Sequence, residues 1–363
     1  MSAKTHAVLS ASAAHRWLKC TPSARLEQQF EDEQSPYAAE GTLAHQLAEQ
    51  LLEYHLEWRK DPPRIPEEMR EYIETYVNVV LERIPEGAAV MLETRLDFSP
   101  WVPEGFGTGD CIIISDERLE IIDLKYGRGV PVSAEGNPQL RLYALGAVHE
   151  FGWLYGFDKV RMTIVQPRLD SISSDELTLE ELMSWGDQIK PIAWQAYTGK
   201  GEFQPGDHCR FCKARFTCRA RAEWNLTMAK YEFREPETLS NEEIAEILKR
   251  ADELQQWVKD IKEYALEQAY RHGAKFPGWK VVEGRSVRKI TDEPAMAQRL
   301  MERGYEPYKQ VLKPLTELEK MVGKKRLAEI AGDLIEKPTG KPTLVPENDK
   351  RPELPPAAVA DFQ

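Results

Sequence analysis

The sequence lacks any run of about 18 apolar residues, the length that a membrane-spanning helix needs. Residues 1–10 also lack the basic patch followed by an apolar stretch that marks a secretion signal. We therefore expect a cytoplasmic protein with no membrane partner. Thiols stay reduced in that compartment, so clustered cysteines are better explained as metal ligands than as disulfides.

Positive charge is outnumbered: Lys and Arg total 48 against 60 Asp and Glu, a net charge of −12. This excess does not exclude a nucleic-acid partner, because phosphate binding depends on local basic density rather than on the sum over the chain. Two segments near residues 15–19 and 210–221 are locally basic, and the loop 127–129 carries one more arginine. The candidate DNA-binding residues are Arg16, Lys19, Arg128, Arg210, Lys213 and Arg215.

The spacing of apolar residues predicts an α/β protein with a mixed central sheet flanked by helices. Ser10 or Ser12 is expected to cap a first short helix. Leu43, Leu47, Leu51 and Leu52 form the expected buried stripe of the next. Predicted helices cover residues 37–59, 66–84, 137–150 and 178–197, and predicted strands cover 89–96, 107–115, 119–126 and 159–166.

We expect three regions along the chain. Residues 1–225 form the α/β core, and 226–335 form a small, mainly helical extension. That extension is predicted to hold a capped helix over 240–272 and a short β-like pair, 279–283 and 286–290. Residues 336–363 are rich in proline and are expected to be extended or disordered.

Two carboxylates and a lysine mark the predicted hairpin. Asp123 and Lys125 are two residues apart, so on a strand their side chains point to one face. Asp110 lies on the neighbouring strand, where it can meet Asp123. Two facing carboxylates repel unless a hard cation such as Mg²⁺ or Mn²⁺ lies between them. The alternative is an ordinary surface hairpin, which an isolated D-x-K would favour.

Four other polar residues bear on that choice. His45 lies near the edge of the apolar stripe of its helix, where a structural histidine is the common case. Gln139 and Tyr143 share one face of the helix after the hairpin. Glu93 lies within a predicted strand, where a carboxylate is costly unless it is paired.

In this order, G-T-x-x-H (41–45), G-x-x-D (107–110), D-L-K (123–125) and Q-x-x-x-Y (139–143) resemble the motifs of RecB-like nucleases. These belong to the PD-(D/E)XK superfamily and include AddB-type and CRISPR-associated adaptation nucleases. The resemblance spans about residues 10–220. It implies a restriction-endonuclease-like core, with His45, Asp110 and Asp123 as metal ligands. It also implies catalytic or site-supporting roles for Lys125, Asp110, Asp123, Gln139 and Tyr143. For Glu93 it leaves open a second metal site, the orientation of a water molecule, or a structural salt bridge.

The cysteines add a second pattern. Cys209, Cys212 and Cys218 lie within ten residues, and Cys20 lies far upstream. Spacing alone leaves a [4Fe–4S] cluster and structural Zn²⁺ about equally favoured. The arrangement is similar to the iron–sulfur cysteines of AddB-type and CRISPR-associated relatives, which implies a cluster that staples the helical periphery to the core. Cys111 lies in an apolar strand and is expected to be a core residue.

The resemblance implies a metal-dependent DNA exonuclease rather than an endonuclease, acting on single-stranded or end-bearing duplex DNA. The C-terminal part resembles that of phage- and prophage-encoded nucleases, which implies a role in recombination or replication. A homo-oligomer or a partner such as a single-strand-binding protein fits that role. The alternatives are a non-catalytic DNA-binding or assembly subunit with the nuclease fold, and a zinc-stabilised interaction protein.

Overall fold

The computed structural model describes residues 7–30, 36–227, 239–283, 290–308, 312–336 and 352. It divides into two compact units, residues 1–282 and 283–363, and each is described by itself. The first unit extends beyond the predicted boundary near residue 225 and includes the long helix α8 (Asn241–His272). Almost all of the proline-rich segment 336–363 lies outside the described residues.

A five-stranded mixed sheet forms the centre of the first unit, which confirms the predicted α/β class. The strands are β1 (Ala89–Asp97), β2 (Phe106–Ile114), β3 (Arg118–Leu124), β4 (Lys159–Gln166) and β5 (Ser171–Thr178). They lie side by side in chain order, and all neighbours are antiparallel except β3 and β4. Strand β5 was not predicted from the sequence; it is a polar edge strand with no buried residue.

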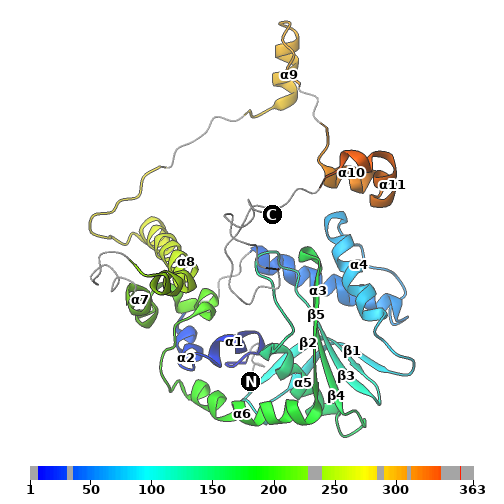
Figure 1. The fold of residues 1–363 in the computed structure, drawn as a ribbon, viewed down its shortest axis with the longest axis vertical. Coiled ribbons are helices and arrows are strands. Elements are labelled where there is room, and N and C mark those ends of the chain that lie inside the picture. The colour runs from blue at the N-terminus through cyan, green and yellow to red at the C-terminus, as the bar shows by residue number, and fades with distance from the viewer. Residues whose placement is uncertain are drawn as a thin grey trace, which may run out of the picture. The chain divides into compact units, whose positions relative to one another are not determined.

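Helices cover both faces of this sheet (Figure 1). On one face α3 (Pro36–His55) and α4 (Glu67–Leu81) enclose one apolar cluster. On the other face α5 (Pro138–Phe151) and α6 (Leu179–Thr198) enclose a second cluster, together with the N-terminal helical turns. Strand β3 shows the arrangement in two neighbouring residues, since Ile121 packs in the second cluster and Ile122 in the first. Both faces of the strand are therefore buried, as expected where β3 and β4 run parallel.

Caps fix where two of the predicted helices begin. The Asn137 side chain accepts hydrogen bonds from the backbone N–H groups of Gln139 and Leu140 at the start of α5. Ser240 and Glu243 form the predicted capping box of α8. The predicted cap of the first helical turns was wrong: Ser10 occupies the N-cap position of η1 (Ala11–Ala13), but its side chain makes no capping hydrogen bond.

The cysteine-rich part of the first unit is built from short turns. It comprises η4 (Asp207–Phe211), η5 (Lys213–Phe216) and α7 (Arg219–Leu226), while α1 (Ala14–Trp17) and α2 (Ser23–Leu26) flank Cys20. Arg221 is fully buried, and its guanidinium donates to Glu253 Oε1 at 2.6 Å and to Asp260 Oδ2 at 2.7 Å. Both carboxylates belong to α8, so this buried ion network holds α8 against the cysteine segment.

In the second unit the described helices are α9 (Glu293–Met301), α10 (Leu315–Val322) and α11 (Lys324–Ala331). The predicted β-like pair is not formed in its first half, because residues 279–283 adopt no strand. Nearly all of its second half, 286–290, lies outside the described residues. No helix in the described part of the chain has the length and apolar character to cross a membrane.

Candidate metal centre and cysteine pocket

Three potential ligands from three different elements meet beside the middle of strands β1 and β2. His45 comes from α3, Glu93 from β1 and Asp110 from β2. One ligand atom from each lies within 4.8 Å of the other two. His45 Nδ1 is 3.2 Å from Asp110 Oδ2 and 4.0 Å from Glu93 Oε1. An imidazole nitrogen with two carboxylates is a donor set that fits Mn²⁺ or Mg²⁺.

The position of Glu93 follows from strand register and from a local distortion. Leu92 pairs with Cys111, so the next residue, Glu93, lies opposite Asp110. Glu93 has a φ of 43°, in the left-handed region that non-glycine residues rarely adopt. Such a conformation costs about 1–3 kcal/mol and persists where the surrounding structure enforces it, often at functional sites. The distortion in β1 is therefore located at the residue that faces Asp110.

The packing of α3 explains why His45 reaches this group. The buried face of the helix is centred on Ala44 and Ala48, with Leu47 on one side of that centre. At 3.6 residues per turn, His45 and Leu43 then lie on opposite margins of the buried face. The predicted burial of Leu43 was wrong, since it is 42% exposed, whereas the other three leucines of the stripe are buried. His45 is left half-buried at the border between core and solvent.

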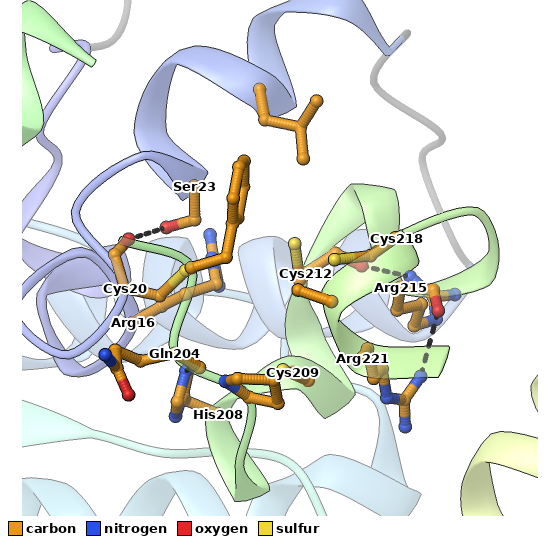
Figure 2. Close-up of a pocket in the computed structure, with 14 residues that line it drawn as sticks. Arg16, Cys20, Ser23, Gln204, His208, Cys209, Cys212, Arg215, Cys218 and Arg221 are labelled. Carbon is orange, nitrogen blue, oxygen red and sulfur yellow. Dashed lines mark hydrogen bonds between the residues drawn. The ribbon is translucent and has the colours of Figure 1, made fainter. Parts of the chain in front are cut away.

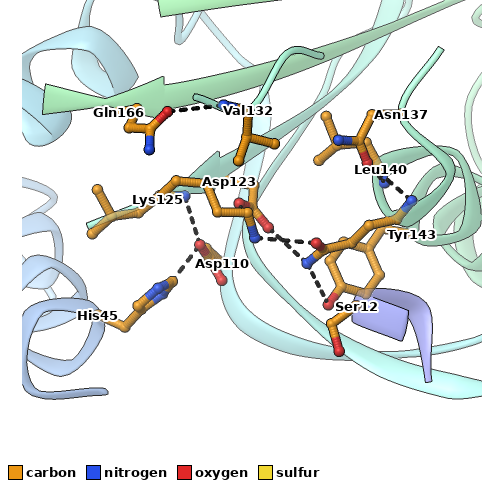
Figure 3. Close-up of polar contacts among 12 residues, drawn as sticks. Ser12, His45, Asp110, Asp123, Lys125, Val132, Asn137, Leu140, Tyr143 and Gln166 are labelled. Atoms are coloured by element: carbon orange, nitrogen blue, oxygen red, sulfur yellow. Dashed lines mark hydrogen bonds and ion pairs between the residues drawn. The ribbon is translucent and has the colours of Figure 1, made fainter. Parts of the chain in front are cut away.

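A second polar cluster lies next to the first (Figure 3). Lys125 Nζ is 2.8 Å from Asp123 Oδ2 and donates to Gln139 Oε1 at 3.1 Å. The amide of Gln139 donates to Asp123 Oδ1 at 3.1 Å and to the Tyr143 hydroxyl at 3.2 Å. The structure thus brings together the lysine, aspartate, glutamine and tyrosine that the motifs singled out.

Asp110 joins the two clusters. Its Oδ2 accepts a hydrogen bond of 2.8 Å from the backbone N–H of Leu124, the residue between Asp123 and Lys125. Asp123 is 2% exposed, but its carboxylate is not part of the group whose atoms lie within 4.8 Å of one another. The structure therefore groups His45 and Asp110 with Glu93 rather than with Asp123, the third predicted ligand. Asp123 is held instead by Lys125 and Gln139.

The ionisation of the site reflects its crowded negative charge. Burial lowers the pKa of His45, but its hydrogen bond to Asp110 and the charges of Asp110, Asp123 and Glu93 raise the pKa to about 9. Burial and the neighbouring Asp110 raise the pKa of Glu93 to about 7. Burial alone would lower the pKa of Lys125, but the adjacent Asp123 outweighs burial and raises the pKa above its usual value. The ammonium therefore stays charged. Without a metal, protons on His45 and Glu93 offset the negative charge of the site. A divalent cation can neutralise the same charge in their place.

Two residues of this site carried no motif signal. Tyr76 on α4 and Glu49 on α3 line a pocket of about 190 Å³ together with His45, Glu93 and Asp110. Burial, with the charges of Cys111, Asp110, Asp123 and Glu93, raises the pKa of Tyr76 well above its usual value. Tyrosine inside an amphipathic helix has the pattern of a core residue, and only tertiary packing places Tyr76 here.

The four predicted cysteine ligands line a second pocket, of about 360 Å³ (Figure 2). Cys20, Cys209 and Cys212 are buried and Cys218 is partly exposed. Burial and the nearby Glu27 raise the pKa of Cys212 to about 12, so its thiolate needs a bound cation to form at neutral pH. Cys111 is fully buried in β2, as predicted, and does not line this pocket.

The sulfur positions are informative about what the pocket can hold. All four cysteines belong to the described residues, and no three of their sulfurs lie within 4.8 Å of one another. A tetrahedral zinc site, with Zn–S bonds of about 2.3 Å, needs sulfurs about 3.8 Å apart. The sulfurs are therefore farther apart than in a formed zinc site.

The six candidate DNA-binding residues divide into two sets. Lys19, Arg128 and Arg210 are exposed. Arg16, by contrast, donates to Glu27 Oε2 at 2.8 Å, and the other oxygen of Glu27 accepts from the backbone N–H of Lys213. Arg215 donates to the carbonyl of Cys212 at 3.2 Å. The buried Glu27, which the sequence did not single out, thus links the N-terminal helices to the cysteine segment.

Together, fold and site define a mixed-sheet α/β protein with a candidate metal centre beside strands β1 and β2. The chain belongs to the family described as Protein of unknown function (DUF2800), whose model matches residues 6–352. It is also similar to a solved structure titled "Crystal structure of SSO0001". The two chains are 16% identical with a TM-score of 0.33, and the match covers 58% of this chain and 85% of that one.

The raised pKa values predict how stability changes with pH when metal is removed. The folded state binds protons at His45 (pKa about 9 against 6.5) and Glu93 (about 7 against 4.5) more tightly than the unfolded state does. The Glu93 contribution is complete below pH 4.5 and disappears as pH rises through 7. The His45 contribution is complete below pH 6.5 and disappears as pH rises through 9.

In EDTA, the unfolding temperature should therefore fall as pH rises from 5 to 9, while the stabilisation given by Mn²⁺ should grow. Thermal unfolding followed by circular dichroism measures both. His45→Gln should flatten the fall between pH 6.5 and 9, and His55→Gln, at the exposed end of α3, should leave it unchanged. Equal slopes in these two variants would contradict the assigned role of His45.

Close packing against Tyr143 explains why a glycine occupies motif position 107, and this explanation can be tested. A Cβ at this position would lie 2.7 Å from a ring carbon of Tyr143, whereas one at Gly129 would meet nothing within 4 Å. Gly107→Ala should displace the buried Tyr143 ring and lower the free energy of unfolding by about 1–3 kcal/mol. Gly129→Ala serves as the matched control in urea denaturation, and equal stability of both variants would show that the ring adapts freely.

Proposed function

We propose that this chain is a deoxyribonuclease of the RecB-like type that hydrolyses phosphodiester bonds with a divalent metal ion. The proposal is carried by the meeting of His45, Glu93 and Asp110 beside the Asp123–Lys125–Gln139 cluster. These side chains come from five segments of the chain and form one acidic site with a single charged lysine at its border. A hard divalent cation fits this donor set.

The fold supports the finer assignment to the PD-(D/E)XK superfamily. Three consecutive antiparallel strands are followed by the crossover helix α5 and the parallel strand β4, with helices on both faces. Asp123 lies near the end of β3 and Lys125 directly follows that strand. The motif residues thus gather around the C-terminal end of β3, where the phosphate of a substrate could approach them.

The chemistry divides among the residues by charge. A bound Mg²⁺ or Mn²⁺ would polarise the phosphoryl group and make a water molecule easier to deprotonate. Lys125 stays charged beside Asp123, so it can stabilise the negative charge that grows on the phosphate oxygens. Gln139 fixes the lysine and the aspartate through one amide group. Attack of water at phosphorus breaks the bond to the 3′ oxygen, which takes up a proton and leaves a 5′-phosphate on the other fragment.

Digestion of end-labelled DNA tests this proposal. We expect single-stranded DNA or duplex with free ends to be degraded with Mg²⁺ or Mn²⁺ and to stay intact with EDTA. Asp110→Asn and Lys125→Ala should each lower the rate at least about 100-fold, since each removes a group that stabilises the transition state. Asp187→Asn, the same change at an exposed carboxylate on α6, is the control.

Labels at the 5′ and 3′ ends and a closed circular substrate give polarity and the need for an end in the same assay. Asp110→Asn protein that digests DNA as fast as the Asp187→Asn control would overturn the nuclease assignment. A wild-type protein that binds DNA without cutting it under any metal would favour the non-catalytic subunit instead.

We further propose that Cys20, Cys209, Cys212 and Cys218 bind a [4Fe–4S] cluster. The wide spacing of their sulfurs supports a cluster over zinc, because a cluster places irons and sulfides between the cysteine sulfurs. Leu26, Phe203 and Pro205 also line the pocket and would shield a cluster from water. Such a cluster would connect the turn after α1 to the turns before α7 and would have a structural role.

Purified anaerobically, the protein should be brown and contain about four irons and four acid-labile sulfides per chain. Cys212→Ser should lose the colour and most of the iron, and its unfolding temperature should fall because the link across the first unit is lost. Cys111→Ala, which removes a thiol outside the pocket, should keep the full iron content. A colourless wild-type protein with one zinc per chain would instead establish the zinc alternative.

A further inference from the structure

A polar group in the pocket beside the candidate metal centre has no hydrogen-bond partner among the described residues. The hydroxyl of Tyr76 is buried and makes no hydrogen bond to any described residue. The whole residue is only 2% exposed and lies on α4, packed against α3 and the sheet. A buried hydroxyl without a partner is costly, so native proteins almost always satisfy one with protein groups or with water.

The surroundings of this hydroxyl point to its partner. Tyr76 lines the same pocket of about 190 Å³ as the three potential ligands His45, Glu93 and Asp110. Glu49, one helical turn after His45 on α3, also lines it. The pocket therefore combines one buried hydroxyl with several carboxylates, and its enclosed part has room for about one water molecule.

Water in this pocket would lie next to a bound cation. Mg²⁺ and Mn²⁺ sites with few protein ligands keep several water molecules around the ion, and these waters need hydrogen-bond acceptors to hold them. The acidic side chains supply acceptors. The oxygen of such a water faces the cation and its hydrogens point outward, so the Tyr76 hydroxyl oxygen can accept a hydrogen bond from it.

We propose that Tyr76 is a positioning residue, which holds a water molecule of the cation's hydration shell in the pocket formed by α3, α4 and the sheet. This inference rests on the proposed metal-dependent function. It assigns to α4, which contributes nothing to the motif series, a part in holding the metal centre. Tyr76 acts through the water and does not itself touch the cation.

The test compares Tyr76→Phe with Tyr72→Phe, the same change one turn earlier on α4, where the ring packs edge-on against Tyr126. Mn²⁺ affinity is measured by calorimetry on metal-free protein, and stability is measured by urea denaturation in EDTA. Tyr76→Phe should bind Mn²⁺ about three- to tenfold more weakly, the effect of one lost hydrogen bond. Its stability in EDTA should match that of Tyr72→Phe. At saturating Mn²⁺, kcat on DNA should fall by a similar factor while KM stays unchanged.

Each other outcome has a defined meaning. If Tyr76→Phe binds Mn²⁺ as Tyr72→Phe does, the proposal for Tyr76 is overturned while the nuclease assignment stands. A loss of stability in EDTA as large as the loss of Mn²⁺ affinity would make Tyr76 a packing residue and also overturn it. Wild-type protein that binds no Mn²⁺ would overturn the proposed function, and this inference with it.

Discussion

Mutual repulsion among Glu93, Asp110 and Asp123 is the constraint on which the site depends. Strand pairing places these carboxylates side by side on three adjacent strands, partly or fully removed from water. Their repulsion is offset from two sides, by His45 on α3 and by Lys125 held by Gln139 on α5. The two helices lie on opposite faces of the sheet, so residues from both helical layers contribute to the site.

The sequence predicted the parts of this arrangement that follow from local spacing. Strand alternation placed Asp123 and Lys125 together, and helical spacing placed Gln139 and Tyr143 on one face of α5; the contacts among these four residues confirm both expectations. Gly107 lies so close to the Tyr143 ring that a side chain would not fit. The motif contains the glycine but does not reveal this contact.

Other features depend on tertiary structure and gave no readable signal. The left-handed conformation of Glu93 arises inside an otherwise regular strand. Tyr76 has the spacing of a core residue, and its unpaired hydroxyl becomes visible only when α4 packs over the site. Strand β5 has a polar sequence because it lies at the sheet edge, where backbone pairing with β4 replaces apolar burial. Which metal the four cysteines could hold depends on the distances between their sulfurs in three dimensions, and residue spacing along the chain does not give those distances.

The position of Cys20, far from the other three cysteines of the pocket, has a consequence for biosynthesis. Cys20 leaves the ribosome early, whereas Cys209, Cys212 and Cys218 emerge only when most of the first unit has been made. A cofactor that requires all four sulfurs can therefore be completed only at a late stage of translation or after it. Until then the early thiol must survive unprotected, and a prematurely terminated chain lacking residues 209–218 would be unable to retain such a cofactor.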